Sequence, residues 1–331
     1  MCRTSPSSRS DRVVLVDTGA RLHFGFYSTT GTISLFAGLG MAIDEPTFRA
    51  EVSPFHGVSV EGPDADRVMS VAEKAVKALG VPGVEIKVLK TIPAHVGLGS
   101  TTQMALGIAQ ALNVLYGLGR GLREVAALMG RGLFSGIGTA VFERGGFILD
   151  SGRRAGGGLE PRCLPRPVIR LEVPGGWRFL LLIREGLRGL DEVSEKSLMM
   201  NLEPMPEEIS SRICRLILQQ LIPALIWDDI SVFGRALTEI QRLVGHYFSP
   251  YQGGVFSHRD ALDLADFLLE EGAYGVGQSS WGPTIYAITT AEEAGGLLSS
   301  ARRFIEEEGL RYEILIARPR NRGAEVSLRP G

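Results

Sequence analysis

The sequence predicts an α/β fold organised in two domains, and three observations support this prediction. The chain has 331 residues, enough for two domains of ordinary size. Short β-branched and apolar runs alternate along it with segments whose apolar residues recur at the helical period. Glycine is abundant, with 42 residues, and the glycines cluster between apolar segments, as expected where the backbone turns tightly or approaches a ligand.

The composition is that of a folded cytoplasmic protein and argues against several classes of function. Hydrophobic residues make up 44% of the chain and charged residues 22%. The 35 basic and 37 acidic side chains give a net charge of −2, which leaves no basic excess to neutralise a nucleic-acid backbone. Residues 1–12 are polar and lack the apolar core of a signal peptide, so we expect a disordered tail. No apolar stretch reaches the ~20 residues of a membrane span.

The first half of the chain is expected to contain strands, helices and one hairpin. The segment at 64–79 has apolar side chains at the helical period, and Gly80 closes it. The helix at 100–116 is the clearest, because Ser100 and Gln103 fit a capping box and an apolar stripe follows them. The other expected elements are strands at 13–16, 18–26, 51–60 and 84–89, a short helix at 122–129, and a hairpin of strands at 140–142 and 146–150.

A segment rich in glycine, proline and arginine at 153–167 marks the expected crossover between the domains. We therefore predict an N-terminal domain over 13–170 and a C-terminal domain over 171–331. The second domain is expected to alternate strands and helices. Its elements are strands at 177–183, 284–288 and 312–317, a polar loop at 185–195, and helices at 207–226, 229–244, 260–271 and 292–308.

The segment from Pro93 to Ser100 is a candidate phosphate-binding loop. It lies between an expected strand and the start of the clearest helix, whose unpaired amides and partial positive charge attract anions. Gly97 and Gly99 lack Cβ atoms, so an anion can reach the backbone amides. The alternative is an ordinary capped helix after a flexible turn. The loop is neither a Walker A motif nor a Rossmann fingerprint, because no lysine follows the second glycine and no G-x-G-x-x-G opens the helix.

A second glycine cluster, at 275–284, offers neutral hydrogen-bonding groups and a flat apolar ring. Gln278, Ser279, Ser280 and Trp281 form a set that suits a sugar or an aromatic ring better than a bare phosphate. A tryptophan in such a turn is also commonly a plug over the core.

A third glycine cluster, at 134–139, contains Ser135 and Gly136. Arg131 and Arg144 flank it, and each could pair with phosphate oxygens or lie solvated at the surface.

Arg21 and His23 alternate with Leu22 and Phe24, so both polar side chains could point to one face of a strand. A lone histidine is more often structural than catalytic. The arginine expected on the same face is what makes His23 a candidate.

Three stretches together resemble the motif regions of the GHMP kinase superfamily. They are ARLHFGF at 20–26, IPAHVGLGSTTQ at 92–103 and GVGQSSWGPTIYAI at 275–288. More specifically, they resemble the family of β-ribofuranosylaminobenzene 5′-phosphate synthase, also called β-ribofuranosylphenol 5′-phosphate synthase. FSGIGTAVFERGGFILD at 134–150 agrees with the same family, and the similarity runs from about Val16 to Ile288.

The resemblance implies a GHMP-kinase-like fold, with an N-terminal domain similar to domain two of ribosomal protein S5 and a ferredoxin-like C-terminal domain. It also implies a reaction of tetrahydromethanopterin biosynthesis. Phosphoribosyl pyrophosphate condenses with para-hydroxybenzoate or para-aminobenzoate, and carbon dioxide and pyrophosphate are released. A ring carbon attacks the anomeric carbon as pyrophosphate leaves, and Mg²⁺ stabilises the departing charge. The resemblance further implies a homodimer with no organic cofactor.

The resemblance also implies roles for individual residues. The candidates for catalysis are Arg21, His23, Ser100 and Gln278. The candidates for binding phosphate and substrate are His95, Gly97, Leu98, Gly99, Thr101, Thr102, Gln103, Ser135, Gly136, Ser279, Ser280 and Trp281. Asp150 and Glu143 are candidate ligands of Mg²⁺, and either could instead pair with an arginine.

Two positions depart from the family pattern. Family members often carry an acidic residue where this chain has Phe26-Tyr27-Ser28, and a basic residue where it has Phe134. Two alternative functions stay open. One is an ATP-dependent small-molecule kinase, although such kinases usually have a longer glycine run where Gln278–Trp281 stand. The other is a non-catalytic paralogue that binds a phosphorylated metabolite.

Overall fold

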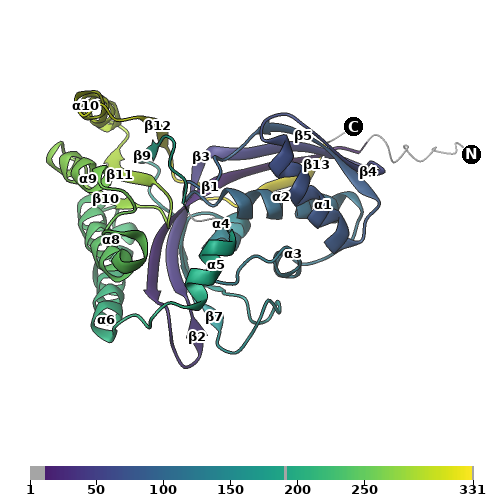
Figure 1. Ribbon diagram of the computed structural model, residues 1–331, viewed down its shortest axis with the longest axis horizontal. Coiled ribbons are helices and arrows are strands. Elements are labelled where there is room, and N and C mark those ends of the chain that lie inside the picture. The colour runs from purple at the N-terminus through teal and green to yellow at the C-terminus, as the bar shows by residue number, and fades with distance from the viewer. Residues whose placement is uncertain (1–11, 190–191, 330–331) are drawn as a thin grey trace, which may run out of the picture.

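The computed structural model describes residues 12–189 and 192–329. The tail expected at 1–12 lies outside the described residues, apart from Arg12. Two sheets with helices packed on them make up most of the molecule, which confirms the predicted α/β class (Figure 1). The larger sheet and its helices occupy one end of the molecule, and the smaller sheet occupies the other end.

The larger sheet has seven strands and is built around two long ones, β1 (Val14–Ser28) and β3 (Ala37–Ser53), which pair antiparallel. The last strand, β13 (Glu325–Leu328), pairs with the other edge of β1, so the expected C-terminal domain over 171–331 contributes one strand to the N-terminal sheet. The other strands are β4 (Gly57–Glu61), β5 (Gly83–Lys90), β6 (Phe147–Asp150) and β8 (Pro167–Leu171), and a separate ribbon pairs β2 (Ser34–Leu35) with β7 (Arg153–Arg154).

Four helices accompany this sheet: α1 (Ala65–Leu79), α2 (Ser100–Leu115), α3 (Leu122–Leu128) and α4 (Ile137–Arg144). α1 ends as predicted at Gly80, which adopts the left-handed conformation with φ of +68°. α2 is buried along most of its length and contacts α1, β1 and β3. Gly107 lets α2 approach the sheet, because a Cβ there would lie 2.8 Å from Cγ1 of Val16.

Two predictions for this part of the chain are wrong, and the strands expected at 13–16 and 18–26 form one strand, β1. The strand expected at 140–142 is part of α4, because Ile137, Ala140 and Val141 recur at the helical period and bury one face of the helix. The strand expected at 51–60 is two strands, the end of β3 and the whole of β4, with a turn between them.

The smaller sheet has four antiparallel strands in the order β10-β11-β9-β12, with one group of helices between its first two strands in sequence and one helix before its last. This topology is ferredoxin-like, as predicted. The strands are β9 (Trp177–Arg184), β10 (Gly275–Gln278), β11 (Thr284–Thr290) and β12 (Tyr312–Ala317), and the helical segments are α5 (Glu192–Met200), α6 (Glu207–Leu216), the π-helical η2 (Ile217–Leu221), α7 (Ile222–Ile226), α8 (Ile230–Gln252), α9 (Asp260–Glu270) and α10 (Ala294–Glu307). α5 begins within the expected polar loop at 185–195, and α8 continues past its expected end at Val244.

One stretch among the described residues, Glu207–Ile226, is long and apolar enough to cross a membrane, judged by length and composition alone. It comprises α6, η2 and α7, which pack against α8. Ile213, Leu216 and Leu221 are fully buried in that packing. Core helices of soluble proteins share these properties, so the stretch is weak evidence for a membrane span.

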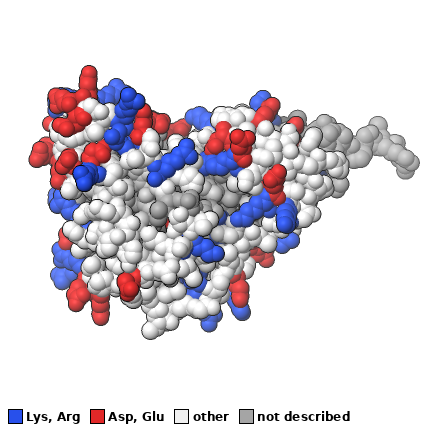
Figure 2. Space-filling view, viewed as in Figure 1, with Lys and Arg blue, Asp and Glu red and all other residues white. Residues whose placement is uncertain are grey.

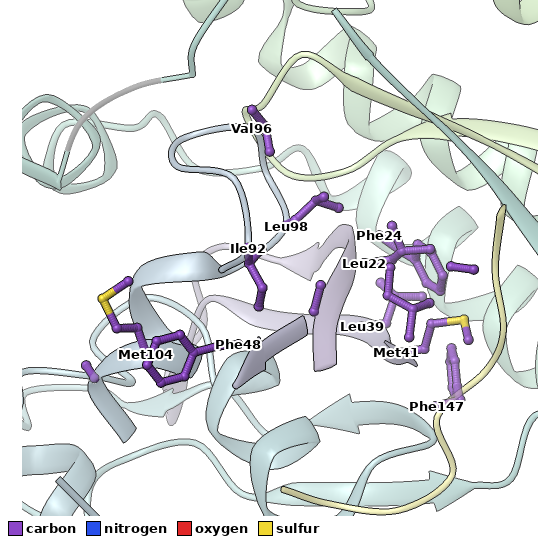
Figure 3. Close-up of a cluster of buried hydrophobic side chains, with 14 of the residues drawn as sticks. Leu22, Phe24, Leu39, Met41, Phe48, Ile92, Val96, Leu98, Met104 and Phe147 are labelled. Atoms are coloured by element: carbon purple, nitrogen blue, oxygen red, sulfur yellow. The ribbon is translucent and has the colours of Figure 1, made fainter. Parts of the chain in front are cut away.

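The largest buried cluster joins the strands of both sheets and holds the loop before α2. Leu22 of β1 and Leu39 of β3 belong to it, and the side chains of Ile92, Val96 and Leu98 reach it from the loop (Figure 3). These three loop side chains are almost fully buried. The loop backbone is therefore anchored by the core rather than left free at the surface.

Candidate active site

The loop between β5 and α2 is shaped by two glycines in the left-handed conformation. Gly97 has φ of +87°, and a Cβ there would lie 2.1 Å from the carbonyl oxygen of Ser279. Gly99, with φ of +75°, is the N-cap of α2, and no side chain caps the helix. The capping box predicted for Ser100 and Gln103 is therefore wrong. Because no side chain occupies the first amides of α2, an anion can reach them.

A pocket lies at this end of α2, and we call it the phosphate pocket. It brings together residues from the first, second and third motifs and from the segments around Arg131 and α5. Its lining residues are Arg21, His95, Gly97, Gly99, Ser100, Thr101, Thr102, Arg131, Gly189, Glu195, Ser280, Trp281 and Gly282. The motif residues that lie far apart in sequence thus converge on one site.

Arg21 of β1 lies beneath the loop. Its Nη1 donates to the carbonyl oxygen of Gly97 at 2.5 Å, and its backbone N–H donates to that of Leu98 at 3.1 Å. A Cβ on Gly99 would lie 2.7 Å from Cγ of Arg21, so the glycine makes room for the arginine. Burial lowers the pKa of Arg21 to about 10, and the charge of Glu195 opposes this shift. The guanidinium is still charged at neutral pH and gives the pocket a fixed positive charge.

A residue that sequence reasoning missed holds the hydroxyl of Ser100. Arg67 of α1 donates from Nη1 to Ser100 Oγ at 3.0 Å. Its other nitrogens donate to the carbonyl oxygen of Ile92 at 3.0 Å and to the carboxylate of Asp64 at 2.6 Å. Since Ser100 Oγ accepts from Arg67, its own hydrogen can be donated into the phosphate pocket.

His23 of β1 is buried, and both of its ring nitrogens are engaged. Nδ1 accepts from the backbone N–H of Gly25 at 3.0 Å, so the neutral ring carries its proton on Nε2, which lies 2.9 Å from Ser135 Oγ and donates to it. Burial, followed by the charge of Arg21, lowers the pKa of His23 well below its ordinary value. Ser135 Oγ also accepts from the N–H of Ile137 at 3.2 Å, which leaves the serine hydrogen for a ligand.

Ser279 and Ser280 tie the third motif to β1 and to the loop. Ser279 is fully buried, and its Oγ donates to the carbonyl oxygen of Gly97 at 2.7 Å and accepts from the N–H of His23 at 3.1 Å. The N–H of Ser280 donates to the carbonyl oxygen of His23 at 3.1 Å. Ser279 thus fixes the loop, whereas Ser280 and Trp281 line pockets.

A second pocket adjoins the first, and we call it the aromatic pocket. Ser280 and Trp281 line both pockets and form their common wall. The Trp281 ring meets Phe248 edge to face, with centroids 4.4 Å apart. The full lining is His23, Gly25, Phe26, Gln241, Val244, Gly245, Phe248, Gln252, Val255, Phe256, Gln278, Ser280 and Trp281. This pocket contains no side chain with a full charge, because its one titratable lining residue is the neutral His23.

Gln278 lines the aromatic pocket with its amide held in place. Its Oε1 accepts from the N–H of Ser257 at 2.6 Å, and its Nε2 donates to the carbonyl oxygen of Ser280 at 2.8 Å. Its backbone N–H donates to Oε1 of Gln241 at 2.9 Å. These bonds fix the orientation of Gln278, so its amide shapes the pocket.

Seven predicted residues line neither pocket: Leu98, Gln103, Ser135, Gly136, Glu143, Asp150 and Ser279. Leu98 buries its side chain in the core. Gln103 is turned inward, where its Nε2 donates to the carbonyl oxygen of Gly138 at 2.9 Å and its Oε1 accepts from Thr18 Oγ1 at 2.7 Å. Glu143 is exposed on α4, and its carboxylate lies 3.7 Å from the neighbouring arginine.

Asp150 is fully buried and is bound by three backbone amides. Its Oδ1 accepts from Gly38 at 3.0 Å and from Gly152 at 2.8 Å, and its Oδ2 accepts from Gly136 at 2.9 Å. Burial raises the pKa of Asp150 to about 6, although the amides oppose this shift. Within residues 12–189 and 192–329 no group of three or more His, Cys, Asp or Glu side chains is placed to hold a metal ion.

Replacing Asp150 by asparagine is expected to lower the free energy of unfolding by roughly 1–3 kcal/mol, because the new NH₂ group would face an amide that needs an acceptor. Urea unfolding of the variant and of the unsubstituted protein measures this difference. An unchanged free energy of unfolding would contradict the structural role of the carboxylate.

Gln278, Ser280 and Trp281 on one wall of the aromatic pocket were predicted from the sequence, and the wall formed by α8 was not. Gln241, Val244, Gly245 and Phe248 all come from α8. Their spacing along the chain is the signal of one helical face, but that signal does not distinguish a pocket wall from ordinary core.

Two family models match the chain: the GHMP kinases N terminal domain over residues 66–146 and the GHMP kinases C terminal domain over residues 221–306. The chain is 35% identical to the beta-ribofuranosylphenol 5'-phosphate synthase of Archaeoglobus fulgidus, over 94% of this chain and 98% of that protein. It is 29% identical to the protein of the same name from Methanocaldococcus jannaschii, over 95% of this chain and 100% of that protein.

A solved structure extends the comparison to the fold. The homoserine kinase from Cytophaga hutchinsonii matches with a TM-score of 0.68, at 19% identity, over 98% of this chain and 100% of that chain. At this identity the match supports the fold alone. Together, these findings confirm the predicted two-domain GHMP-kinase-like fold. The chain belongs to the beta-ribofuranosylphenol 5'-phosphate synthase family of the GHMP kinase superfamily.

Proposed function

We propose that this chain condenses phosphoribosyl pyrophosphate with para-hydroxybenzoate or para-aminobenzoate and releases carbon dioxide and pyrophosphate. The product is the 5′-phosphate of a ribosylated phenol or aniline. The proposal includes a cytoplasmic location and a homodimer. Full-length similarity to proteins named as synthases of this kind supports it.

The observation that carries the proposal is that a polar pocket with a positive charge adjoins a pocket lined by aromatic rings. The phosphate pocket offers helix amides, hydroxyl groups and the guanidinium of Arg21, which suit a diphosphate. The aromatic pocket offers Phe and Trp rings, which suit a benzene ring. Because Ser280 and Trp281 line both pockets, an anomeric carbon bound in one pocket and a ring carbon bound in the other would meet beside these two residues.

The proposed reaction balances without an external oxidant or base. The bond between the anomeric carbon and the diphosphate oxygen breaks, and its electron pair leaves with pyrophosphate. The ring carbon that bears the carboxylate forms the new carbon–carbon bond. Loss of carbon dioxide then returns an electron pair to the ring and restores its aromaticity.

The protonation states of Arg21 and His23 match the charges that develop in this reaction. Arg21 stays positive and lies on the diphosphate side, where negative charge accumulates. His23 stays neutral and lies on the ring side. A neutral imidazole adds no second positive charge beside an oxocarbenium-like centre. Its Nε2 instead fixes Ser135, whose hydroxyl can then donate to a ligand.

The phosphate pocket fits Mg²⁺ bound together with a diphosphate. Mg²⁺ prefers oxygen ligands and is usually held by one or two carboxylates with phosphate oxygens. The hydroxyls of Ser100, Thr101 and Thr102 and the carboxylate of Glu195 line this pocket and supply such oxygens. Asp150 does not fit, since three amides occupy its carboxylate. The ion would neutralise charge on the departing diphosphate.

The kinase alternative is not favoured. The chain is 26% identical to a homoserine kinase from Methanopyrus kandleri, over a smaller share of its length than the synthases cover. An alcohol acceptor would also find few unpaired polar groups in the aromatic pocket, because backbone groups already engage both ends of the side-chain amides of Gln278 and Gln241.

Turnover of the purified protein tests the proposal. With Mg²⁺, phosphoribosyl pyrophosphate and para-hydroxybenzoate carrying a labelled carboxyl group, we expect labelled carbon dioxide and pyrophosphate in a ratio of about one to one. The same assay with ATP and an alcohol acceptor is the control for a kinase. Binding of phosphoribosyl pyrophosphate without release of either product would instead support the non-catalytic paralogue.

A further inference from the structure

A third pocket continues the phosphate pocket on the side away from the aromatic pocket, and we call it the basic pocket. It shares His95, Thr101 and Arg131 with the phosphate pocket and shares no residue with the aromatic one. Its remaining lining comes mainly from α1 and the helix it contacts: Arg67, Ser70, Val71, Lys74, Ala105 and Met129. Three cationic side chains therefore surround one hollow, and none of the residues that line it is acidic.

Lys74 lines this pocket, and among the residues that the structure describes its ammonium group forms no ion pair. It is exposed on α1, and its Nζ lies 3.7 Å from where a Cβ on Gly130 would be. Arg67, by contrast, is held by Asp64, Ile92 and Ser100. The acidic Glu195 lines the phosphate pocket but not the basic pocket. The positive charge of Lys74 is thus available to a ligand.

We propose that the basic pocket is a second phosphate subsite, which binds a terminal phosphate of the ribosyl donor. This inference rests on the proposed donor, phosphoribosyl pyrophosphate, which carries phosphate at both ends. The anomeric carbon lies between these two phosphate ends and must face the aromatic pocket, so one phosphate end extends away from that pocket along the phosphate pocket. The basic pocket is where such an extension leads. Its occupant is either the 5′-phosphate or the outer phosphate of the diphosphate, and both have the same chemistry.

The test compares Lys74→Ala with Lys77→Ala. Both lysines are exposed on α1, and Lys77 lies outside the basic pocket, so it is a matched control for loss of one positive charge. For Lys74→Ala we expect KM for phosphoribosyl pyrophosphate to rise about 10-fold with kcat changed less than about 2-fold, because one charge-assisted bond to the donor is lost. For Lys77→Ala we expect neither constant to change.

Calorimetric binding of two simpler anions identifies the occupant and separates this inference from the proposed function. If the pocket binds the 5′-phosphate, Lys74→Ala lowers the affinity for ribose 5-phosphate and leaves the affinity for pyrophosphate unchanged. If the pocket binds the outer phosphate of the diphosphate, Lys74→Ala lowers the affinity for pyrophosphate and leaves that for ribose 5-phosphate unchanged. Equal affinities of Lys74→Ala and the unsubstituted protein for both anions would overturn the subsite, as would failure of the unsubstituted protein to bind either. Absence of turnover with intact anion binding would overturn the proposed reaction but leave the subsite standing.

Discussion

Replacing Arg21 by methionine is expected to lower kcat/KM for phosphoribosyl pyrophosphate by about 100-fold or more, while the free energy of unfolding changes by less than about 1 kcal/mol. Removing one donor aimed at developing negative charge costs about 10²–10³ in rate. Arg21 is the cation held directly beneath the phosphate loop by the Gly97 carbonyl oxygen. Its charge therefore acts where the diphosphate departs.

The free energy of unfolding of this variant is expected to change little, because burying the charge of Arg21 is itself unfavourable. The lowered pKa of Arg21 shows that its surroundings disfavour the cation. Methionine restores most of the apolar stem, and the Gly97 carbonyl oxygen still accepts from Ser279 Oγ. Removing a cation whose burial is unfavourable recovers the cost of desolvating it, which offsets the lost hydrogen bond to Gly97.

Steady-state kinetics and urea unfolding measure the two effects on the same preparation. Arg303→Met is the control, because Arg303 is an exposed arginine of α10 that is paired with Glu271 and lines neither pocket. We expect that control to leave kcat/KM unchanged. A fall in kcat/KM of less than about 3-fold for Arg21→Met would remove the arginine from the proposed mechanism.

Replacing Gly97 by alanine is expected to lower kcat/KM by about 100-fold or more through displacement of the phosphate loop. The new Cβ would lie 2.1 Å from the Ser279 carbonyl oxygen and 3.0 Å from the Gly282 Cα. Both contacts are with backbone atoms, so the loop must move away from the third motif. A shift of about 1 Å in a positioning element can cost 10²-fold in rate.

Gly119→Ala is the matched control for the backbone conformation. Gly119 also has a positive φ, of +66°, but a Cβ there meets nothing within 4 Å. Its substitution should cost about 1–2 kcal/mol of stability from left-handed strain and leave kcat/KM unchanged. Equal kinetic losses in the two variants would show that general strain, and not the contact with Ser279, reduces activity.

The local parts of the site could be predicted from sequence because they depend on short-range rules. Two glycines between a strand and an amphipathic helix predicted a pocket at the helix end, and Thr101 and Thr102 line that pocket. The capping role predicted for Ser100 is wrong. A left-handed glycine can replace a side-chain cap, and the freed hydroxyl is then held by Arg67 from another helix.

The parts that could not be predicted depend on contacts between distant segments. Residues 140–142 of α4 were expected to be a hairpin strand, yet α4 packs on α2, where a Cβ on Gly138 would lie 2.9 Å from Cγ2 of Thr102. Asp150 was a candidate metal ligand or arginine partner, because the sequence does not show which groups surround a carboxylate. In the structure three backbone amides donate to it.

Charge distribution over the surface agrees with a small-molecule function. On the face drawn in Figure 2, basic and acidic side chains are interspersed. The positive charge that matters for the proposed reaction is instead concentrated inside the pockets, at Arg21, Arg67, Lys74 and Arg131.

The central claim is that the first amides of α2 bind a diphosphate beside a ring bound against Trp281. A crystal structure of the protein with Mg²⁺, pyrophosphate and para-hydroxybenzoate tests it most directly. We expect phosphate oxygens within hydrogen-bonding distance of the amides of Thr101 and Thr102, and the benzene ring in the aromatic pocket. Pyrophosphate bound elsewhere, with this helix end occupied only by solvent, would contradict the claim.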